Sequence, residues 1–205
     1  MGKIALRKSQ KSEVNIAVPL IYSSGPPSFE YVFKNDQVGA IDFLKHAFVR
    51  VGGEFSYDNH YSLYLDNEMV GIGSVFDAKQ ASSFTFYDGK NILRFYKLKS
   101  LGIIRRGLQV EGLIKLPKKK EIVLAHLGVQ PDMQGKGLGT KLIAALMEEA
   151  NQEEDSRFIL DVSEENPRAK ALYDRLGFIV TKKNNSTLKN KYSYVANHLR
   201  MERLS

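Results

Sequence analysis

The chain has 205 residues, of which 43 % are apolar and 26 % are charged, and it contains no cysteine. This composition is ordinary for a folded globular protein, so collagen-like, low-complexity and wholly disordered chains are excluded. The absence of cysteine also excludes disulfides, thiolate metal sites, iron–sulfur clusters and a cysteine nucleophile. The four histidines have no spacing typical of metal ligands, so we expect no metal site.

The positive charge is concentrated in one part of the chain. The net charge is +7, but residues 91–120 hold nine basic residues and a single acidic one, Glu111, and therefore carry +8. The remaining chain sums to −1, which is nearly neutral. This basic segment suits an anionic partner, although charge alone does not identify one.

No targeting signal stands out at the start of the chain. The longest early apolar run, residues 14–22, is far shorter than the ~20 residues that a membrane-spanning helix needs. Basic residues precede this run, but Glu13 adjoins it and no small-residue cleavage site follows. We therefore expect a soluble, cytoplasmic protein without a membrane partner.

The first 120 residues predict short, mixed elements. Apolar periodicity and turn residues indicate a helix over 12–22, an aromatic run over 29–33, a helix over 40–51, strands over 55–65 and 68–76, a basic helix over 92–104, and a loop or strand over 108–116. The two strands would form a hairpin that turns at Asp66-Asn67, a tight polar pair.

The C-terminal half alternates strands and helices more clearly. Its pattern indicates a strand over 121–129, a helix from Leu138, a strand over 158–162, a helix from Asn166-Pro167 to Gly177, and strands over 178–181 and 192–201. No internal repeat or long linker interrupts the chain. We therefore expect one mixed α/β domain over residues 1–205.

The turn between the first of these strands and the next helix is rich in glycine. Gly135, Gly137 and Gly139 leave backbone N–H groups uncovered where a helix begins, a place that suits a phosphate, and Lys136 adds a full charge. The same glycines could also form a tight turn that binds nothing. Because the turn reads G-x-G-x-G, it fits neither the dinucleotide fingerprint nor the P-loop.

Two motifs resemble signatures of the GNAT superfamily of acyl-CoA-dependent N-acetyltransferases. Residues 134–139 (QGKGLG) resemble its (Gln/Arg)-x-x-Gly-x-(Gly/Ala) signature, and residues 127–131 resemble the end of the strand before it. Downstream, residues 166–178 resemble its second signature, N-x-x-A-x-x-x-Y-x-x-x-G-F. The resemblance implies an α/β (mixed α+β) fold with a largely antiparallel, splayed central sheet flanked by helices.

The resemblance also implies acetyl-CoA as cofactor and a set of residues that would bind it. Backbone groups around Val129 would pair with the pantetheine arm and polarise the thioester carbonyl, and the glycine turn would hold the pyrophosphate. Residues 121–205 would form this acetyl-CoA-binding half, and residues 1–120 would shape the acceptor side. The implied binding residues are Leu127, Gly128, Val129, Gln134, Gly135, Lys136, Gly137, Leu138, Gly139, Thr140, Asn166 and Tyr173.

Two catalytic residues are implied by the same resemblance. Tyr173 would donate a proton to the departing CoA thiolate, although its apolar helical stripe with Ala169 and Leu172 is also typical of core packing. Glu121 would act as general base, or else offset the lysines before it at the strand entrance. His126 on the same strand could also titrate near neutrality. Glu121, His126 and water stay open as the base.

The amine acceptor is the least defined part of the site. Polar residues in the first turn and the first hairpin strand are the candidates for binding it, namely Tyr22, Ser23, Ser24, Tyr57, Asn59 and His60. Such residues commonly satisfy only nearby backbone groups. No acidic cluster in the sequence marks a pocket for a polyamine or an aminoglycoside. The acceptor, a small molecule or a protein amine, the acyl chain length and any homodimer stay open.

The leading hypothesis is transfer of an acetyl group from acetyl-CoA to a primary amine by direct nucleophilic attack. The lack of cysteine agrees with it, because no cysteinyl acyl-enzyme can form. One alternative is a nucleic-acid or ribosome-associated module in which Phe95 and Tyr96 stack on bases beside Arg94 and Arg106. We favour a solvated basic face over nucleic-acid binding there. Another alternative is an acyl-CoA sensor without catalysis.

Overall fold

The computed structural model describes residues 2–150 and 156–204. Its strands are β1 (Ile4–Lys8), β2 (Tyr61–Leu65), β3 (Glu68–Asp77), β4 (Glu121–Val129), β5 (Arg157–Ser163), β6 (Ile179–Asn184) and β7 (His198–Leu204). Its α-helices are α1 (Val14–Ser23), α2 (Pro26–Phe33), α3 (Ala40–Phe48), α4 (Ala78–Tyr96), α5 (Ser100–Leu113), α6 (Leu138–Glu149) and α7 (Pro167–Arg175).

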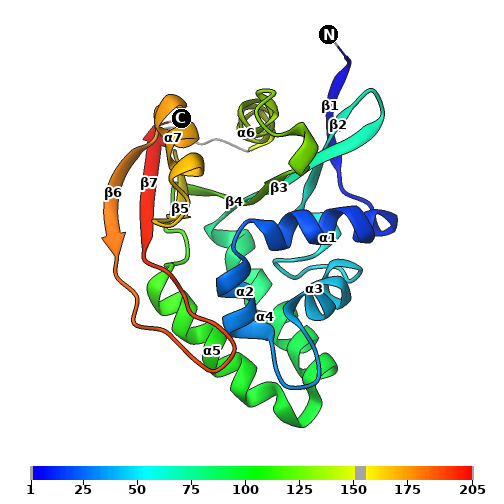
Figure 1. Ribbon diagram of the computed structural model, residues 1–205, viewed down its shortest axis with the longest axis vertical. Coiled ribbons are helices and arrows are strands. Elements are labelled where there is room, and N and C mark those ends of the chain that lie inside the picture. Colours follow the sequence, from blue (N-terminus) through cyan, green and yellow to red (C-terminus); the bar gives the residue numbers. More distant parts are fainter. Residues whose placement is uncertain (1, 151–155, 205) are drawn as a thin grey trace.

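The strands form one seven-stranded sheet in the order β1-β2-β3-β4-β5-β7-β6. Every neighbouring pair is antiparallel except β4 and β5, which run parallel. In Figure 1, α6 and α7 lie towards one end of the molecule, and α2, α4 and α5 lie towards the other. The largely antiparallel α/β sheet flanked by helices is therefore confirmed.

Two large hydrophobic cores fix the helices to the sheet, and a small third cluster packs Ala81 and Phe84 of α4 against Phe76 of β3. Helices α1 to α5 pack in one core around Phe43, Phe48 and Ile72, all of them fully buried. Helix α6 packs in the other core, where Leu146 lies with Phe158 of β5. Full burial of such a side chain contributes about 1.5–3 kcal/mol relative to exposure. The middle strands β3 and β4 are thereby held between the two cores.

Three local features of β4 shape the space beside it. Its ladder with β5 ends at Val123 and Ile159, so the predicted splay begins there. Its register with β3 shifts near His126, whose φ of 54° is uncommon for a residue with a side chain. At Gly128, a Cβ atom would lie 2.5 Å from the carbonyl oxygen of Leu20. Only glycine therefore lets α1 approach β4 so closely.

Helices α4 and α5 form an arm, defined as residues 78–113, that is anchored to α2. The chain turns between the two helices at Lys97, which has a φ of 51°. The Tyr96 hydroxyl donates a hydrogen bond of 2.5 Å to the carbonyl oxygen of Phe33, and the Arg106 guanidinium donates one of 2.8 Å to that of Tyr31. Because both bonds are made by side chains of the arm, they fix its position against α2.

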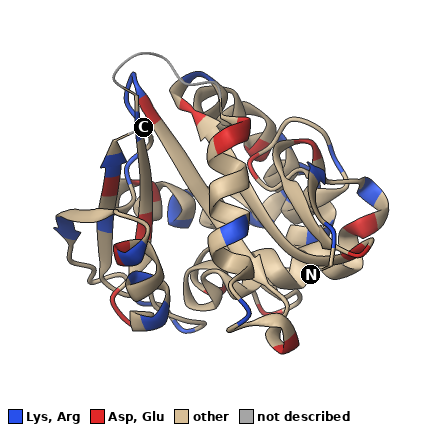
Figure 2. Cartoon of the chain, turned by 90° about the horizontal axis from the view of Figure 1, so that it is seen from above, with Lys and Arg blue, Asp and Glu red and all other residues tan. Residues whose placement is uncertain are grey.

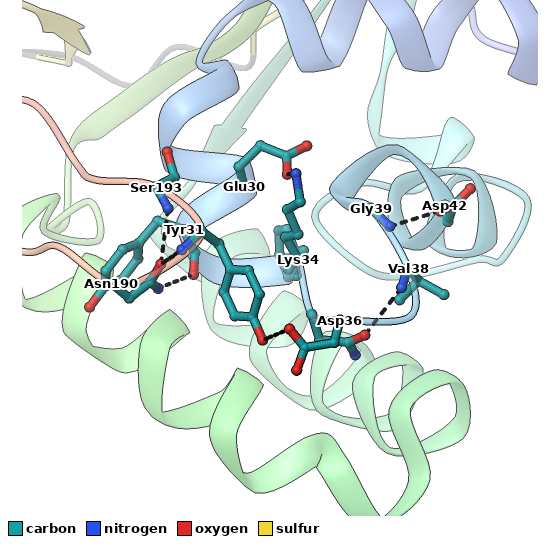
Figure 3. A network of polar contacts seen from close by, with 12 residues as sticks. Glu30, Tyr31, Lys34, Asp36, Val38, Gly39, Asp42, Asn190 and Ser193 are labelled. Carbon is teal, nitrogen blue, oxygen red and sulfur yellow. Dashed lines mark hydrogen bonds and ion pairs between the residues drawn. The ribbon is translucent and has the colours of Figure 1, made fainter.

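The segment between β6 and β7 crosses α2 as well (Figure 3). The Asn190 amide donates a hydrogen bond of 3.0 Å to the carbonyl oxygen of Tyr31. The Lys191 ammonium lies 2.7 Å from the Asp36 carboxylate, which also accepts a hydrogen bond from the Tyr192 hydroxyl. The arm therefore holds α2 on one side. The segment between β6 and β7, which belongs to the C-terminal part of the chain, holds it as well.

Several predicted elements are confirmed at or near their bounds. The strand over 121–129 is β4, and the helix from Leu138 is α6. Asn166 caps α7, since its side-chain oxygen accepts a hydrogen bond of 3.0 Å from the Ala169 N–H. Asp66 and Asn67 form the hairpin turn with φ values of 50° and 68°.

Other predicted elements are wrong. Residues 55–60 do not extend the hairpin strand, because their polar side chains bond locally, as when the Asn59 amide donates to the carbonyl oxygen of Gly53. Residues 108–113 continue α5 instead of forming a loop or strand, and the last strand begins only at His198. The basic helix over 92–104 is broken at Lys97.

The sequence interpretation also missed β1 and the first part of α4. Serine, threonine and glycine in residues 78–91 hide the helical period. A capping box is the signal that could have shown the start of α4. The Asp77 carboxylate accepts from the Gln80 N–H at 2.8 Å, and the Gln80 side chain accepts from the Asp77 N–H at 3.1 Å.

Charge is distributed over much of the molecule. Seen from above, basic and acidic residues are interleaved on the elements in view (Figure 2). Of the helices that the structure describes, none has the length and apolar character needed to span a membrane.

Candidate functional site

A cavity of about 850 Å³ lies along the part of β4 that has separated from β5. This volume is within the range of small-molecule and cofactor sites. One part of its lining comes from the glycine turn and the helices α6 and α7, and another comes from α2, the arm and the turn before β2. The cavity therefore joins the two halves of the chain that the sequence assigns to cofactor and acceptor.

The glycine turn forms an open cradle at the start of α6. Gly137 has a φ of 77° and immediately precedes the helix, whose first turn has no side-chain cap among the described residues. A Cβ atom placed on Gly135 or Gly137 would meet no heavy atom within 4 Å. Uncapped N–H groups beside open space at a helix N-terminus fit an anionic group such as a pyrophosphate.

Polar side chains brace this cradle against α7. The Gln134 side chain donates a hydrogen bond of 3.2 Å to the carbonyl oxygen of Val129 and accepts one of 2.9 Å from Arg168. Arg168 also lines the cavity, so it brings a cation close to the cradle. Sequence reasoning did not select Arg168, although it lies within the second motif. Lys136 does not line the cavity, and its ammonium lies 3.2 Å from the Met133 sulfur.

The other predicted cofactor residues surround the same space. Asn166 uses its side-chain oxygen to cap α7 and lines the cavity. Leu127, Gly128, Val129, Leu138, Gly139 and Thr140 line the cavity too. Of the twelve residues that the resemblance selects, Lys136 alone lies outside this lining.

Tyr173 lines the cavity from α7. Its ring packs edge-on to Phe178 with the ring centroids 6.2 Å apart. Burial raises the pKa of the Tyr173 hydroxyl to about 12. The hydroxyl therefore stays protonated at neutral pH and can donate a proton or a hydrogen bond into the cavity.

Glu121 lies away from the cavity, at the first residue of β4. Its buried carboxylate accepts a hydrogen bond of 2.8 Å from the Lys118 N–H, and Arg157 lies 3.3 Å from it. These contacts match the alternative in which Glu121 holds charge at the strand entrance. The cavity instead receives a carboxyl group from Glu54, which sequence reasoning missed.

A pair of histidines connects Glu54 to the protein interior. The His126 Nε2 lies 3.5 Å from the Glu54 Oε1, and the His126 Nδ1 lies 3.0 Å from the His60 Nε2. The His60 Nδ1 lies 2.8 Å from the carbonyl oxygen of Ser56. Burial lowers the pKa of His60 to about 4 and that of His126 well below 6.5. Both imidazoles are therefore neutral at neutral pH.

The hydrogen bonds assign the tautomers of the two histidines. A carbonyl oxygen only accepts, so the His60 Nδ1 carries the proton and its Nε2 is bare. That bare nitrogen accepts from the His126 Nδ1, which leaves the His126 Nε2 bare as well. The bare nitrogen faces the Glu54 carboxyl group. The chain of bonds thus aims a fixed acceptor at Glu54.

Glu54 belongs to an acidic cluster that only the fold brings together. Asp88 of α4 and Glu111 of α5 line the same cavity, and the Asp88 carboxylate accepts from the Glu54 N–H at 3.0 and 3.2 Å. Burial and the charges of Asp88 and Glu111 raise the pKa of Glu54 to about 8. Its side chain is 37 % exposed, so a ligand in the cavity can reach it. No group of described residues is arranged to hold a metal ion.

The acidic cluster corrects the expectation that no such group marks an acceptor pocket. Glu54, Asp88 and Glu111 are separated by 20 or more residues in the sequence, so no local spacing announces them. Aromatic side chains complete the same wall, namely Phe29, Phe33, Phe55 and Phe76. This part of the cavity is therefore apolar with a few carboxyl groups. Such a lining suits an amine that is attached to an apolar group.

Two of the predicted acceptor residues line the cavity. They are Ser23 and Ser24, whose hydroxyls donate to the carbonyl oxygens of Leu20 and Ile21. The Tyr22 hydroxyl donates to the Glu30 carboxylate instead. Tyr57, Asn59 and His60 lie behind the wall, where the Asn59 amide and the His60 imidazole bond to backbone carbonyls. His60 contacts His126, Asn59 bonds to the residue before Glu54, and Tyr57 packs against Phe48.

The raised pKa of Glu54 predicts how stability depends on pH. A carboxyl group with a higher pKa in the folded state keeps its proton after the unfolded chain has lost its own, so stability falls as pH rises. Since the pKa of Glu54 rises from 4.5 to about 8, its contribution to the free energy of unfolding should be lost between about pH 4.5 and 8. The lowered pKa values of His60 and His126 act in the opposite direction below pH 6.5, so the net fall should appear from pH 6.5 to about 8. Urea unfolding at several pH values should show this fall, and Glu54→Gln should reduce it. An equal slope in both proteins would contradict the raised pKa.

Comparison with known proteins agrees with this geometry. Residues 43–178 match the sequence model of the acetyltransferase (GNAT) family. A curated relative, the 5-NmdU N-acetyltransferase of Pseudomonas phage PaMx11, is 43 % identical over 60 residues, which are 29 % of this chain and 41 % of that protein. The match thus spans less than half the length of that relative.

Solved structures share the fold. An N-acetyltransferase from Staphylococcus aureus Mu50 aligns with a TM-score of 0.69 and 14 % identity over 97 % of this chain and 100 % of its own. The ribosomal-protein-S18-alanine N-acetyltransferase from Escherichia coli aligns with a TM-score of 0.52 and 14 % identity over 98 % and 94 %. At these identities the likeness concerns the fold alone. From the family match and the fold together, the chain belongs to the acetyltransferase (GNAT) family.

Proposed function

We propose that the chain transfers an acetyl group from acetyl-CoA to a primary amine by direct attack within the cavity. The observation that carries this proposal is that one cavity joins the open cradle at Gly137 to the carboxyl group of Glu54. An anionic cofactor and a cationic acceptor would then meet beside the separated part of β4. In this proposal, residues 121–205 form the cofactor side of the cavity and residues 1–120 form the acceptor side.

The cofactor side would work through backbone groups and one cation. The N–H groups of residues 134–140 would bind the pyrophosphate, with Arg168 as a further contact that the sequence interpretation did not include. Acetyl-CoA supplies the activated acetyl thioester. Backbone groups of β4 around Val129, beyond the last pair with β5, would hold the pantetheine arm and polarise the carbonyl.

The acceptor side would remove a proton from the amine. Its ammonium form would be drawn to the cluster of Glu54, Asp88 and Glu111, because a cation there favours ionised carboxyl groups. Glu54 would accept the proton, since its pKa near 8 is close to the working pH of a general base. His126 and, behind it, His60 would position Glu54. We propose Glu54 for this role in place of Glu121.

Tyr173 would complete the transfer. As the nitrogen bonds to the acetyl carbon and loses its second proton to solvent, the carbon–sulfur bond breaks and the Tyr173 hydroxyl would give its proton to the departing sulfur. Tyr173 would then be reprotonated from solvent. The acetylated amine and free CoA then leave the cavity. The identity of the acceptor is also part of this proposal. One candidate is 5-NmdU, which appears in the name of the phage relative. The cytoplasmic location of the protein also stays a prediction.

The proposal is tested by incubating the protein with acetyl-CoA and a panel of primary amines while free thiol is measured. The panel includes 5-NmdU, an aliphatic amine, an arylalkyl amine and a diamine. Thiol release that requires one of these amines supports the proposal. Binding of CoA without turnover on any amine would instead favour the sensor hypothesis.

The cradle gives a prediction of its own. Gly137→Ala should weaken CoA binding about tenfold, because the methyl group enters the space where the phosphates would accept their hydrogen bonds. The matched control is Gly177→Ala, since Gly177 has a similar φ of 84° but does not line the cavity. Calorimetric titration with CoA separates the two variants. Equal losses in both would show that backbone strain, and not the cradle, is responsible.

A further inference from the structure

The outer face of the arm remains without a role in the proposed function. On α4 it presents Phe86, Lys90 and Leu93, and on α5 it presents Leu101, Arg105 and Leu108, each set at the spacing of one helical face. The opposite face of each helix holds the buried and cavity-lining residues. We call these six residues, together with Lys97 and Leu98 between the helices, the arm face.

The arm face exposes large apolar side chains to an unusual degree. Leu98 is 99 % exposed and Leu101 is 78 % exposed. Phe86, Leu93 and Leu108 are exposed by more than half as well. A single exposed leucine needs no explanation, but a group of five on one short segment is typical of an interaction surface.

Positive charge predominates beside these apolar side chains. Lys90, Arg94, Lys97, Lys99 and Arg105 are all exposed on the arm. The acidic residues within residues 78–113 are Asp88 and Glu111, and both line the cavity, although Glu111 is exposed as well. The Lys90 ammonium lies 4.2 Å from the centroid of the Phe86 ring, so cation and apolar surface are in direct contact. The arm face is therefore both cationic and apolar.

The structure removes the basis for nucleic-acid binding at this segment. Tyr96 is buried with its hydroxyl bonded to α2, and Phe95 packs against Phe43 and His46. Neither ring can stack on a base as the sequence hypothesis requires. Arg106 is held by two backbone carbonyls of the α2 region. The apolar side chains that remain exposed on the arm face are four leucines and Phe86, and the Lys90 ammonium lies over the Phe86 ring.

A second copy of the chain is also a poor partner for this face. In a symmetric dimer the same patch meets itself, so its cations Lys90, Lys97 and Arg105 would face the same three cations of the other copy. Like charges in direct opposition disfavour such a contact. A partner that is both negatively charged and apolar matches the arm face, and an anionic lipid surface has that combination.

We propose that the arm docks peripherally onto an anionic lipid surface. Leu98 and Leu101 would enter the boundary between headgroups and acyl chains, and the surrounding lysines and arginines would contact the lipid phosphates. The turn between α4 and α5 lies at the end of the molecule opposite the N-terminus, where a flat surface can reach it (Figure 1). The expectation of no membrane partner rested on the lack of a spanning segment, which peripheral docking does not need.

The test is co-sedimentation of the full chain with phosphatidylcholine vesicles, with or without about 30 % phosphatidylserine. Wild type should bind the anionic vesicles and not the neutral ones. Leu98→Ser should weaken this binding about tenfold, because one leucine no longer leaves water. Lys97→Gln should weaken it about fivefold and make it less sensitive to salt. The matched control is Ile179→Ser, since Ile179 of β6 is 66 % exposed but lies outside the arm.

Several outcomes would overturn the proposal. They are an absence of binding to anionic vesicles, binding that Leu98→Ser leaves unchanged, and an equal loss in Ile179→Ser. Duplex DNA or RNA that binds at the arm cations and is indifferent to Leu98→Ser would assign the face to nucleic acid instead. Because Leu98 is almost fully exposed, Leu98→Ser should keep the wild-type Tm, and acetyl transfer to a soluble amine should be unchanged.

Discussion

Glu54→Gln should lower kcat for acetyl transfer about 10³-fold while leaving the Kd for CoA unchanged. The substitution keeps the shape of the side chain but removes the group that accepts the proton of the amine. Glu54 lines the cavity, faces the bare nitrogen of His126 and has a pKa raised to about 8. A loss confined to turnover is therefore expected, since the cradle for CoA is formed by other residues.

The matched control for this variant is Glu121→Gln. Glu121 is the base that the resemblance to the family implied, but its carboxylate is bonded at the strand entrance and does not line the cavity. We expect Glu121→Gln to lower the Tm and to change kcat by less than about threefold, because the lost contacts are structural. The opposite ranking of the two variants would return the role of base to Glu121.

The pH profile gives a second readout for Glu54. The carboxylate form accepts the proton, so kcat/KM should rise with pH through a midpoint near 8. Because Asp88 also has a raised pKa, near 7, the two groups would titrate as a coupled pair. Ionisation of the acceptor amine should also make kcat/KM rise with pH. This part of the rise should persist in Glu54→Gln. An identical profile in wild type and variant would contradict Glu54 as the base.

Tyr173→Phe should lower kcat about 10²-fold with little change in the KM for either substrate. The phenyl ring keeps the packing against Phe178, so the fold of α7 is preserved. What is lost is a hydroxyl whose pKa of about 12 keeps it protonated and able to supply a proton to the departing sulfur. Stopped-flow measurement of free thiol would report this step.

An acetyl donor with a better leaving group provides the control for Tyr173. An acyl-CoA analogue whose thiol is more acidic should narrow the difference between wild type and Tyr173→Phe, because its sulfur departs without needing a proton. A constant ratio of rates with both donors would mean that Tyr173 only packs in the apolar stripe of α7.

The local structure of the proposed cofactor side could be predicted from sequence, because its residues are close together in the chain. The strand β4, the glycine turn and the start of α6 lie within residues 121–140, and each local pattern points to the same structure. The cap at Asn166 and the helix after it are similarly local. For such segments, backbone geometry and hydrogen bonding follow from neighbours in the sequence.

The acceptor side could not be predicted, because distant segments create it. Glu54 and Asp88 meet only when the turn before β2 packs on α4, a helix that the periodicity of residues 78–91 did not reveal. His60 and His126 are 66 residues apart and become a pair through the shift of register in β4. The protonation of these side chains depends on their burial and on one another's charge. A local sequence pattern shows neither of these.

The most direct test of the central claim is the initial-rate pattern when acetyl-CoA and the amine acceptor are varied together. If both occupy one cavity and the amine attacks directly, the double-reciprocal lines should intersect, because a ternary complex must form before CoA leaves. Mass spectrometry should find the acetyl group on the amine and none on the protein. Parallel lines, with an acetylated protein as intermediate, would contradict the account.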